Sequence, residues 1–425
     1  MRLILTYSDH FGNANQASTA KVRVTVLMLA SSCPRMSYPP APPFPVGVNE
    51  PEKSTLPPPF AALAANVGRA VDSIVGVSAM ISVLAVISAV PVLNLLSLGY
   101  LLEASGRVAR SGRLRDGWVG LAGFTQLGKI FIAGWIALLP ARLIHSFWRD
   151  AELIGPNSAS SAVLRVVLIV VILLTALYLF GAVIRGGKWR HFLWPTPWRF
   201  FRWLGSEFSW NAFFQSLFAT LQGLRLLHFL RLGTLGFAGA ALWLVFPVSI
   251  LMTASGFANP GISFLLSLLG SLFLAVSALY LPFLQTRFAL TGKFGEFLDP
   301  LAARLAFGRA PVASCLALTA TLLFALPPYL LKVELTPSEV AWLPNVFFVL
   351  CLFPARLLLG WALSRSERRE STPRRISRWV AHLAALPVVA TYVFFVWISQ
   401  YLSWHGTLGL IEQHAFLVPS PLLGL

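Results

Sequence analysis

The sequence predicts an all-α protein, a polytopic transmembrane helical bundle. The chain of 425 residues is 56% hydrophobic and only 12% charged, whereas soluble globular domains carry about 25% charged residues. Its mean hydropathy is +0.72, and apolar runs long enough to cross a bilayer recur along it. No run alternates polar and apolar residues as barrel strands do, so the backbone of each crossing must be satisfied within a helix.

The first part of the chain is not expected to span. Residues 1–35 contain one apolar patch, at 22–30, which is too short to cross and includes Arg23. A weak signal segment and an over-extended translation start are both open interpretations. Ten prolines fall between residues 34 and 59, so 36–72 is expected to be an extended, disordered leader. The membrane domain is then expected to cover 73–425.

About eight spans are expected in this domain. They lie near residues 74–102, 130–148, 162–184, 235–253, 262–284, 312–331, 340–363 and 380–402. The first is longer than an untilted crossing needs and is interrupted by Pro91 and Asn94. It is either a kinked span or a segment that dips in and returns, which would place the N-terminus in the cytoplasm.

The basic residues predict the orientation. The formal net charge is +17, and in a membrane protein such an excess marks cytoplasmic loops rather than a nucleic-acid partner. The loops 103–129, 185–234, 285–311 and 364–379 carry 22 Lys and Arg, against 2 in the segments between them. The protein is therefore expected to be a multi-pass protein of the bacterial cytoplasmic (inner) membrane, with these loops inside and the C-terminus external.

An internal repeat is the most specific pattern in the chain. Residues 187–195 and 292–300 both read G-K-aromatic-x-x-F-L-x-P. The shared positions are Gly187, Lys188, Phe192 and Pro195 in one copy, and Gly292, Lys293, Phe297 and Pro300 in the other. Each copy follows an apolar run, so the expected unit is a two-helix hairpin plus a cytoplasmic loop, repeated in parallel. Within it, glycine suits a helix C-cap.

No catalytic, cofactor or metal site is expected. The sixteen acidic residues were assigned to loops or to the N-terminal region, and spans without carboxylates argue against ion-coupled carriers. The histidines are scattered singly, no metal-ligand spacing occurs, and no hydrolase motif is present.

Two groups of residues are candidates for anion or lipid contacts. Arg356 follows a proline deep in the seventh span, whereas Arg142, like Arg165, falls near a span end where a snorkelling position also explains it. The second group is the aromatic and basic stretch Trp198, Arg199, Arg202 and Trp203. This stretch is expected to lie in the membrane interface against anionic headgroups; base stacking on nucleic acid is the weaker alternative.

The first basic loop carries a resemblance. The residues Gly99, Tyr100, Gly106, Arg107, Gly112, Leu114 and Trp118 resemble the signature GY...R...G.L..W of a family of uncharacterised prokaryotic multi-pass membrane proteins, a domain of unknown function. The resemblance covers about 50 residues. It implies a bacterial inner-membrane protein and carries no activity.

These observations favour a non-enzymatic membrane scaffold or accessory component in contact with the lipid bilayer. A transporter or channel for a neutral or anionic solute is the alternative, favoured by the repeat and by proline-broken helices. A lipid-modifying membrane enzyme using loop residues is the third hypothesis.

Overall fold

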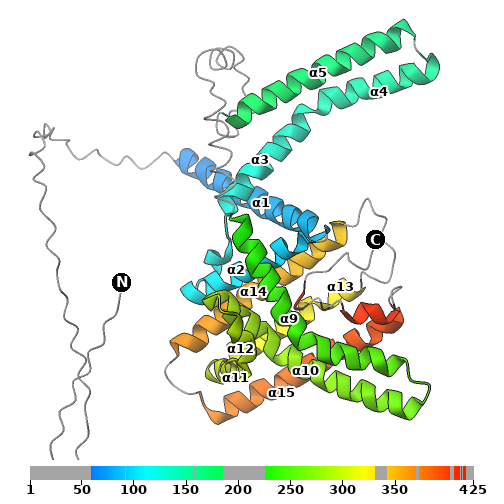
Figure 1. The fold of residues 1–425 in the computed structure, drawn as a ribbon. Helices are drawn as coiled ribbons and strands as arrows, with labels where there is room; N and C mark the ends of the chain where they lie inside the picture. The colour runs from blue at the N-terminus through cyan, green and yellow to red at the C-terminus, as the bar shows by residue number, and fades with distance from the viewer. Residues whose placement is uncertain are drawn as a thin grey trace, which may run out of the picture. The chain divides into compact units, whose positions relative to one another are not determined.

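The computed structural model describes part of the chain and is helical throughout the regular structure of that part (Figure 1). The described residues are 59–90, 92–156, 158–184, 225–330, 342–369, 373–402, 406–411, 413 and 415–417. The chain divides into two units, Met1–Pro57 and Pro58–Leu425, and all described residues belong to the second unit. The segment 1–35 and most of the leader expected at 36–72 thus lie outside the described residues.

The helices follow one another with short connections. They are α1 (Pro59–Ser88), α2 (Asn94–Ser111), α3 (Leu121–Ala137), α4 (Leu139–Ile154), α5 (Ala159–Ile184), α9 (Leu226–Ser255), α10 (Pro260–Thr291), α11 (Pro300–Arg309), α12 (Pro311–Phe324), α13 (Leu326–Leu330), α14 (Trp342–Arg368) and α15 (Arg375–Leu402), with the 3-10 helices η1 (Leu114–Gly117), η2 (Phe294–Leu298) and η5 (Gly406–Ile411). Because α1 begins at Pro59, the C-terminal part of the expected leader is helical. Proline is well tolerated in the first turn of a helix.

Seven helical segments in the described residues are long and apolar enough to cross a membrane. One of them, Leu121–Ile154, combines α3 and α4. An eighth is reached if α11 and α12, which are bent by 116° at their junction, are counted as one broken span. The all-α polytopic bundle predicted from composition is confirmed.

The range 74–102, expected to be a single membrane segment, forms two helices. α1 ends at Ser88 and α2 begins at Asn94, and the intervening Val92 has a positive φ of 66°. The chain turns back here, since the Ser97 hydroxyl donates to the Leu84 carbonyl at 3.0 Å. Of the two interpretations left open by the sequence, the helix arrangement therefore resembles the segment that enters and returns.

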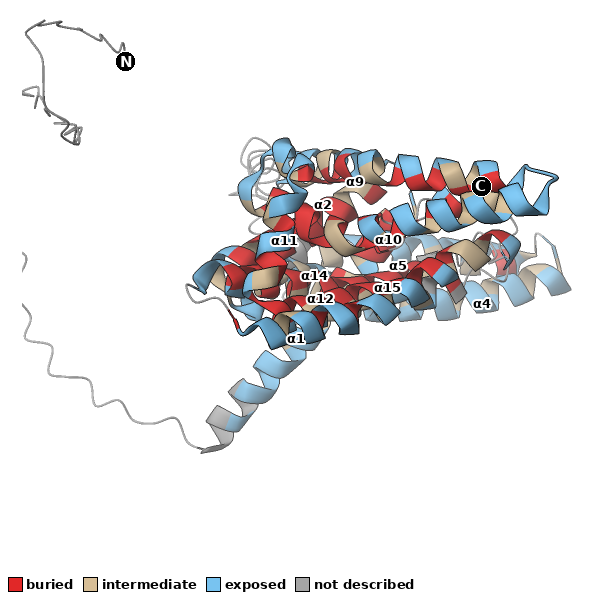
Figure 2. Cartoon of the chain, turned by 90° about the horizontal axis from the view of Figure 1, so that it is seen from below, coloured by how far each residue is buried: buried red, intermediate tan, exposed pale blue. Residues whose placement is uncertain are grey.

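Helix α2 lies at the centre of the bundle. It packs against α1, α9, α10 and α14, and most of its residues are buried (Figure 2). Its side chains follow those of α14 in the same direction. The Tyr100 ring stacks on Phe353, with centroids 6.4 Å apart, while Gly112 at its end lies beside the Arg368 guanidinium.

Glycines allow this close packing. A Cβ atom on Gly99 would overlap the backbone carbonyl of Phe229 in α9, and one on Gly233 would overlap the carbonyl of Leu95 in α2. Each glycine thus lets the partner backbone approach, as small residues do at interfaces between membrane helices. The glycine that precedes Tyr100 in the resemblance motif therefore has a packing reason.

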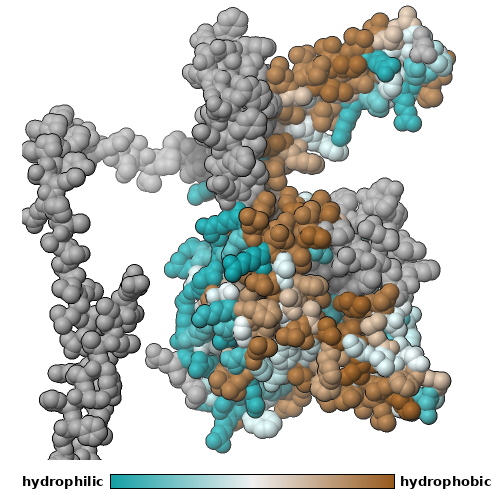
Figure 3. Space-filling model, viewed as in Figure 1, coloured by the Kyte–Doolittle hydropathy of each residue, from teal (hydrophilic) through white to brown (hydrophobic). Residues whose placement is uncertain are grey.

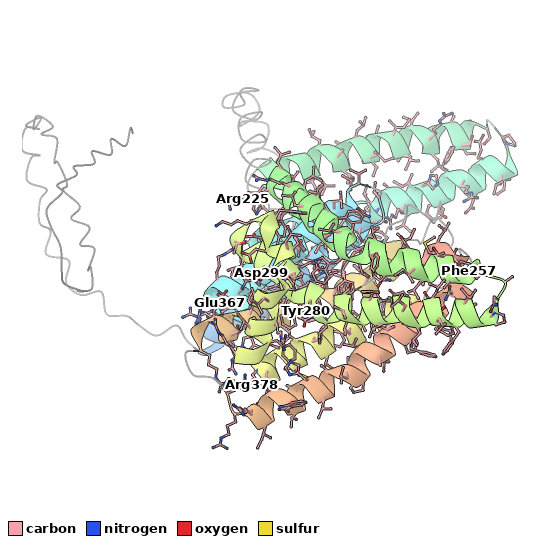
Figure 4. All side chains as sticks on the ribbon, turned by 60° about the horizontal axis from the view of Figure 1, so that its bottom comes forward. Arg225, Phe257, Tyr280, Asp299, Glu367 and Arg378 are labelled. Atoms are coloured by element: carbon pink, nitrogen blue, oxygen red, sulfur yellow. The ribbon has the colours of Figure 1, made fainter. Side chains whose placement is uncertain are left out.

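The four basic loops meet at one end of the bundle. Figure 4 shows Arg225, Asp299, Glu367 and Arg378 at this end, and Phe257, in the turn between α9 and α10, at the opposite end. We call the end with the four loops the basic end. In Figure 3, hydrophilic surface gathers along one side of the molecule, whereas hydrophobic surface covers much of α9 and α10. This gathering agrees with the alternation of charge, although it does not by itself say which side of a membrane the basic end faces.

Helices α4 and α5 have a different environment. They pack against each other and against α3, and only 6% of the residues in the apolar window Ala159–Leu179 are buried. The corresponding share in Pro344–Arg368 of α14 is 61%. The surface of α5 is therefore left for lipid or for another protein.

Candidate functional site

The most polar buried cluster lies at the basic end and is centred on Glu103 of α2. Its side chain is only 9% exposed. One carboxylate oxygen accepts from Nε of Arg107 at 2.8 Å and lies 3.2 Å from a terminal nitrogen of Arg110, and the other lies 3.3 Å from Nε2 of His228 in α9. The cluster stabilises a buried carboxylate with two guanidinium groups, as a buried charge requires.

Arginines at this end also join three helix ends. Arg110 donates to the carbonyls of Ala289 and Leu290 at the end of α10, each at 3.4 Å. Arg368 of α14 donates to the carbonyl of Ser111, at the end of α2, at 2.6 Å. The last carbonyls of a helix have no intrahelical donor and carry the negative end of its dipole. The three helices are therefore connected through groups that would otherwise need water.

The loop after α2 has the same geometry as the loop after α10. Gly112 and Gly292 are left-handed C-caps with φ of 73° and 72°. The side-chain oxygen of the preceding Ser111 or Thr291 accepts from the second amide that follows it, at 3.2 Å in both loops. A 3-10 helix then begins in each loop, η1 and η2.

This structural pair differs from the pair that the sequence singled out. The copy with Gly187, Lys188, Phe192 and Pro195 lies outside the described residues, so its likeness to 292–300 stays a prediction. A signal for the observed pair is nevertheless present: residues 107–116 and 287–296 share R-apolar-A-x-[ST]-G-[RK]-apolar-x-[DE]. The conservative exchanges Ser/Thr, Arg/Lys and Asp/Glu hid it from a comparison based on identities.

The described copy of the expected repeat has a structural role. Gly292 caps α10, and Lys293 after it is extended. Phe297 is fully buried against Phe288, and its carbonyl accepts from the indole of Trp243 at 2.8 Å. Pro300 begins α11 rather than only stopping a helix. The glycine C-cap predicted from the sequence is confirmed.

Arg356, the candidate for an anion path, is an internal residue. Its side chain is only 1% exposed. One terminal nitrogen donates to Oε1 of Gln285 in α10 at 2.8 Å, and the other donates to the carbonyls of Ala415 and Phe416, at 3.4 and 3.3 Å. Gln285 donates in turn to the Phe416 carbonyl at 3.0 Å. The guanidinium therefore holds the C-terminal segment 415–417 against α10 and α14, and in this conformation contacts neither lipid nor solvent.

The other candidate contacts are divided between exposed and undescribed positions. Arg142 is exposed on α4, with its guanidinium carbon 3.7 Å from the centroid of the Trp135 ring. Arg165 is exposed on α5. The stretch with Trp198, Arg199, Arg202 and Trp203 lies outside the described residues, and its interfacial location stays a prediction.

The expectation that no membrane segment holds a carboxylate is wrong. Asp72 lies within the apolar helical segment Asn66–Ser88, and Oδ2 is 2.7 Å from Nζ of Lys129 in α3. Glu103, assigned to a loop because the first span was ended at residue 102, lies inside α2. Both errors come from placing segment boundaries by hydropathy alone, which cannot recognise an acidic residue that is neutralised by a partner distant in sequence.

Comparisons of the chain with protein-family models, with curated proteins and with solved structures give no match.

Proposed function

We propose that this protein is a non-enzymatic scaffold or accessory component of a bacterial cytoplasmic membrane. The observation that carries the proposal is the complete enclosure of Arg356 by protein groups. A cationic side chain that serves an anion path needs access to that path. Here the charge deepest in the bundle stabilises the packing of a terminal segment, which is a structural function.

The packing of α2 supports the same proposal. Its backbone approaches α9 at Gly99, α10 at Gly106 and α14 at Gly360, the glycine of the neighbouring helix. A carrier that alternates between two conformations needs helices that rock against each other, and backbone contacts of this kind on three sides oppose such rocking. By contrast, α5 offers an apolar surface that its own chain leaves open, which is what an accessory component needs for partner helices.

The proposed orientation places the basic end in the cytoplasm and the C-terminus outside, since Lys and Arg are retained on the cytoplasmic side of inner membranes. Because α1 and α2 turn back on each other, we also propose a cytoplasmic N-terminus. Reporter fusions after residues 300 and 375 are expected to read cytoplasmic. A cytoplasmic result for a fusion after residue 337 would contradict the orientation.

A flux assay tests the functional proposal. The full-length chain reconstituted into liposomes is expected to pass chloride, phosphate and glycerol no faster than protein-free liposomes. Photocrosslinking in native membranes is expected to give discrete products from a probe at Val170 on α5 and none from a probe at the equally apolar Leu265 on α10, a residue exposed beside its own hairpin. Protein-dependent flux of any of these solutes would contradict the proposal.

A transporter or channel is the second candidate, because of the bent pair α11 and α12. Broken helices line substrate sites in many transporters. The bend occurs at Ala310 and Pro311, where a proline follows the last residue of the first helix. If flux is found, replacing Pro311 with Ala should change its rate, whereas a proline at a merely structural junction would alter stability without altering the rate per folded molecule.

A further inference from the structure

A pocket of about 530 Å³ lies at the basic end, between the end of α14 and the beginning of α12. One wall carries Arg365, Arg368 and Arg369, and the other carries Val312 and Leu316. The pocket thus combines three cationic groups with an apolar surface. None of these residues was among the candidates from the sequence, because the arginines were read only as part of a cytoplasmic loop.

The basic wall is held in place by the protein. Arg368 donates to the Ser111 carbonyl at 2.6 Å, and the Arg365 guanidinium carbon lies 4.4 Å from the centroid of the Trp361 ring. Residues 365, 368 and 369 fall within adjacent turns of one helix, where like charges repel each other. An anion between them would relieve this repulsion, and the planar guanidinium group is well suited to phosphate oxygens.

The apolar wall continues away from the arginines. Val312, Leu316 and Leu323 are exposed, and their spacings of four and seven residues place them on one face of α12. This face forms an apolar strip that begins in the pocket and follows the helix. A free phosphate ion would have no use for such a strip, whereas an acyl chain attached to a phosphate would lie along it.

We propose that the pocket binds the phosphate headgroup of an anionic phospholipid, with an acyl chain along the exposed face of α12. The arginines contact the phosphate, and the apolar strip distinguishes a lipid from a soluble phosphate. The basic end is where the positive-inside rule places the inner leaflet, whose surface is rich in anionic lipid. The proposal is independent of the scaffold function, since a carrier could bind lipid at the same place.

Lipid binding to the purified full-length chain tests the charge requirement. Native mass spectrometry in a neutral detergent would compare short-chain phosphatidylglycerol with phosphatidylcholine of the same chain length. The variant R365Q/R369Q keeps Arg368, which binds the end of α2. It is expected to lower the phosphatidylglycerol affinity about tenfold or more, because each basic residue near anionic lipid contributes about fivefold.

The matched control removes the same charge at the same end. R374Q/R375Q changes two exposed arginines at the start of α15 that do not line the pocket, and it is expected to keep the affinity within about twofold. An equal loss in both double variants would show that binding depends only on net charge and would overturn the proposal. Equal affinity of the wild type for the two lipids would overturn it as well.

A second variant separates lipid from soluble phosphate. L316N leaves the arginines intact and is expected to weaken phosphatidylglycerol binding at least fivefold while leaving glycerol phosphate binding unchanged. If glycerol phosphate competes with phosphatidylglycerol at equal concentration, the ligand is a soluble phosphate and the lipid assignment is wrong. Because the side chain of Leu316 is exposed, folding of this variant should be unaffected, and a melting curve would check it.

Discussion

Helices α14 and α5 are similarly apolar, yet their surroundings are opposite. The mean hydropathy of the most apolar window is 2.1 in Pro344–Arg368 and 2.8 in Ala159–Leu179, while the buried shares are 61% and 6%. The more apolar helix is therefore the less buried one. Lipid is as apolar as a protein core, so hydropathy alone does not say which helix forms the centre of a membrane protein.

The centre is instead marked by polar and small residues. Helix α2 contains Glu103, Arg107 and Arg110 and is not among the candidate spans, yet it packs against four neighbouring helices. Its charged groups are satisfied by other residues, and its glycines admit neighbouring backbones. The comparison teaches that burial here follows partner groups and side-chain size, and it predicts that substitutions in α2 and α14 cost much more than substitutions in α3 to α5.

The largest expected effect is at a backbone contact. Gly99→Ala places a Cβ against the Phe229 carbonyl, and because a backbone atom cannot move aside alone, the variant should lose about 3 kcal/mol of unfolding free energy. Gly123→Ala in α3 is the control, since nothing lies within 4 Å of its Cβ position. Melting temperatures in detergent would measure both. A similar melting temperature for both variants would remove the distinction between the regions.

The next effect concerns two arginines. Arg356→Met leaves the Gln285 side chain and the Phe416 carbonyl without their buried donor, with an expected cost of about 2 kcal/mol. The C-terminal segment should then become sensitive to carboxypeptidase. Arg142→Met removes one exposed cation–π contact, which is worth about 0.5–1 kcal/mol at most. Equal protease sensitivity in the two variants would refute the anchoring role of Arg356.

A smaller effect is expected at the acidic cluster. Glu103→Gln keeps the shape of the side chain but weakens its charge-assisted contacts with Arg107 and Arg110, so about 1.5 kcal/mol should be lost. Asp116→Asn is the control, because its carboxylate is half-exposed and 3.9 Å from the Arg115 guanidinium. Surface pairs of this kind contribute little, and a larger loss for Asp116→Asn would contradict the ranking.

The sequence predicts the helical class and the gathering of the basic loops because both follow from the bilayer. A helix must be apolar to cross, and positive charge marks one end. The glycine C-cap at Gly292 follows from local chemistry in the same way. These features depend on neighbouring residues only, so a single sequence is sufficient to predict them.

Features that depend on distant partners could not be predicted. The apolar run at 74–102 is continuous, and the turn between α1 and α2 depends on contacts such as Ser97 with Leu84. The partners of Arg356 lie 71, 59 and 60 residues away in the chain. The lipid pocket combines arginines from one helix with an apolar face of another. A hydropathy profile assigns each of these residues correctly to a segment but does not show what it contacts.

The most direct test of the central claim is labelling with a photoactivated carbene dissolved in the bilayer, followed by mass spectrometry of peptides from α5 and α14. In liposomes containing only this chain, the account predicts strong labelling of residues 163–174 and weak labelling of residues 352–363. In native membranes the labelling of α5 should fall if partner helices cover it. Equal labelling of α5 and α14 in the liposomes would contradict the account, because α14 would then face lipid instead of forming the core.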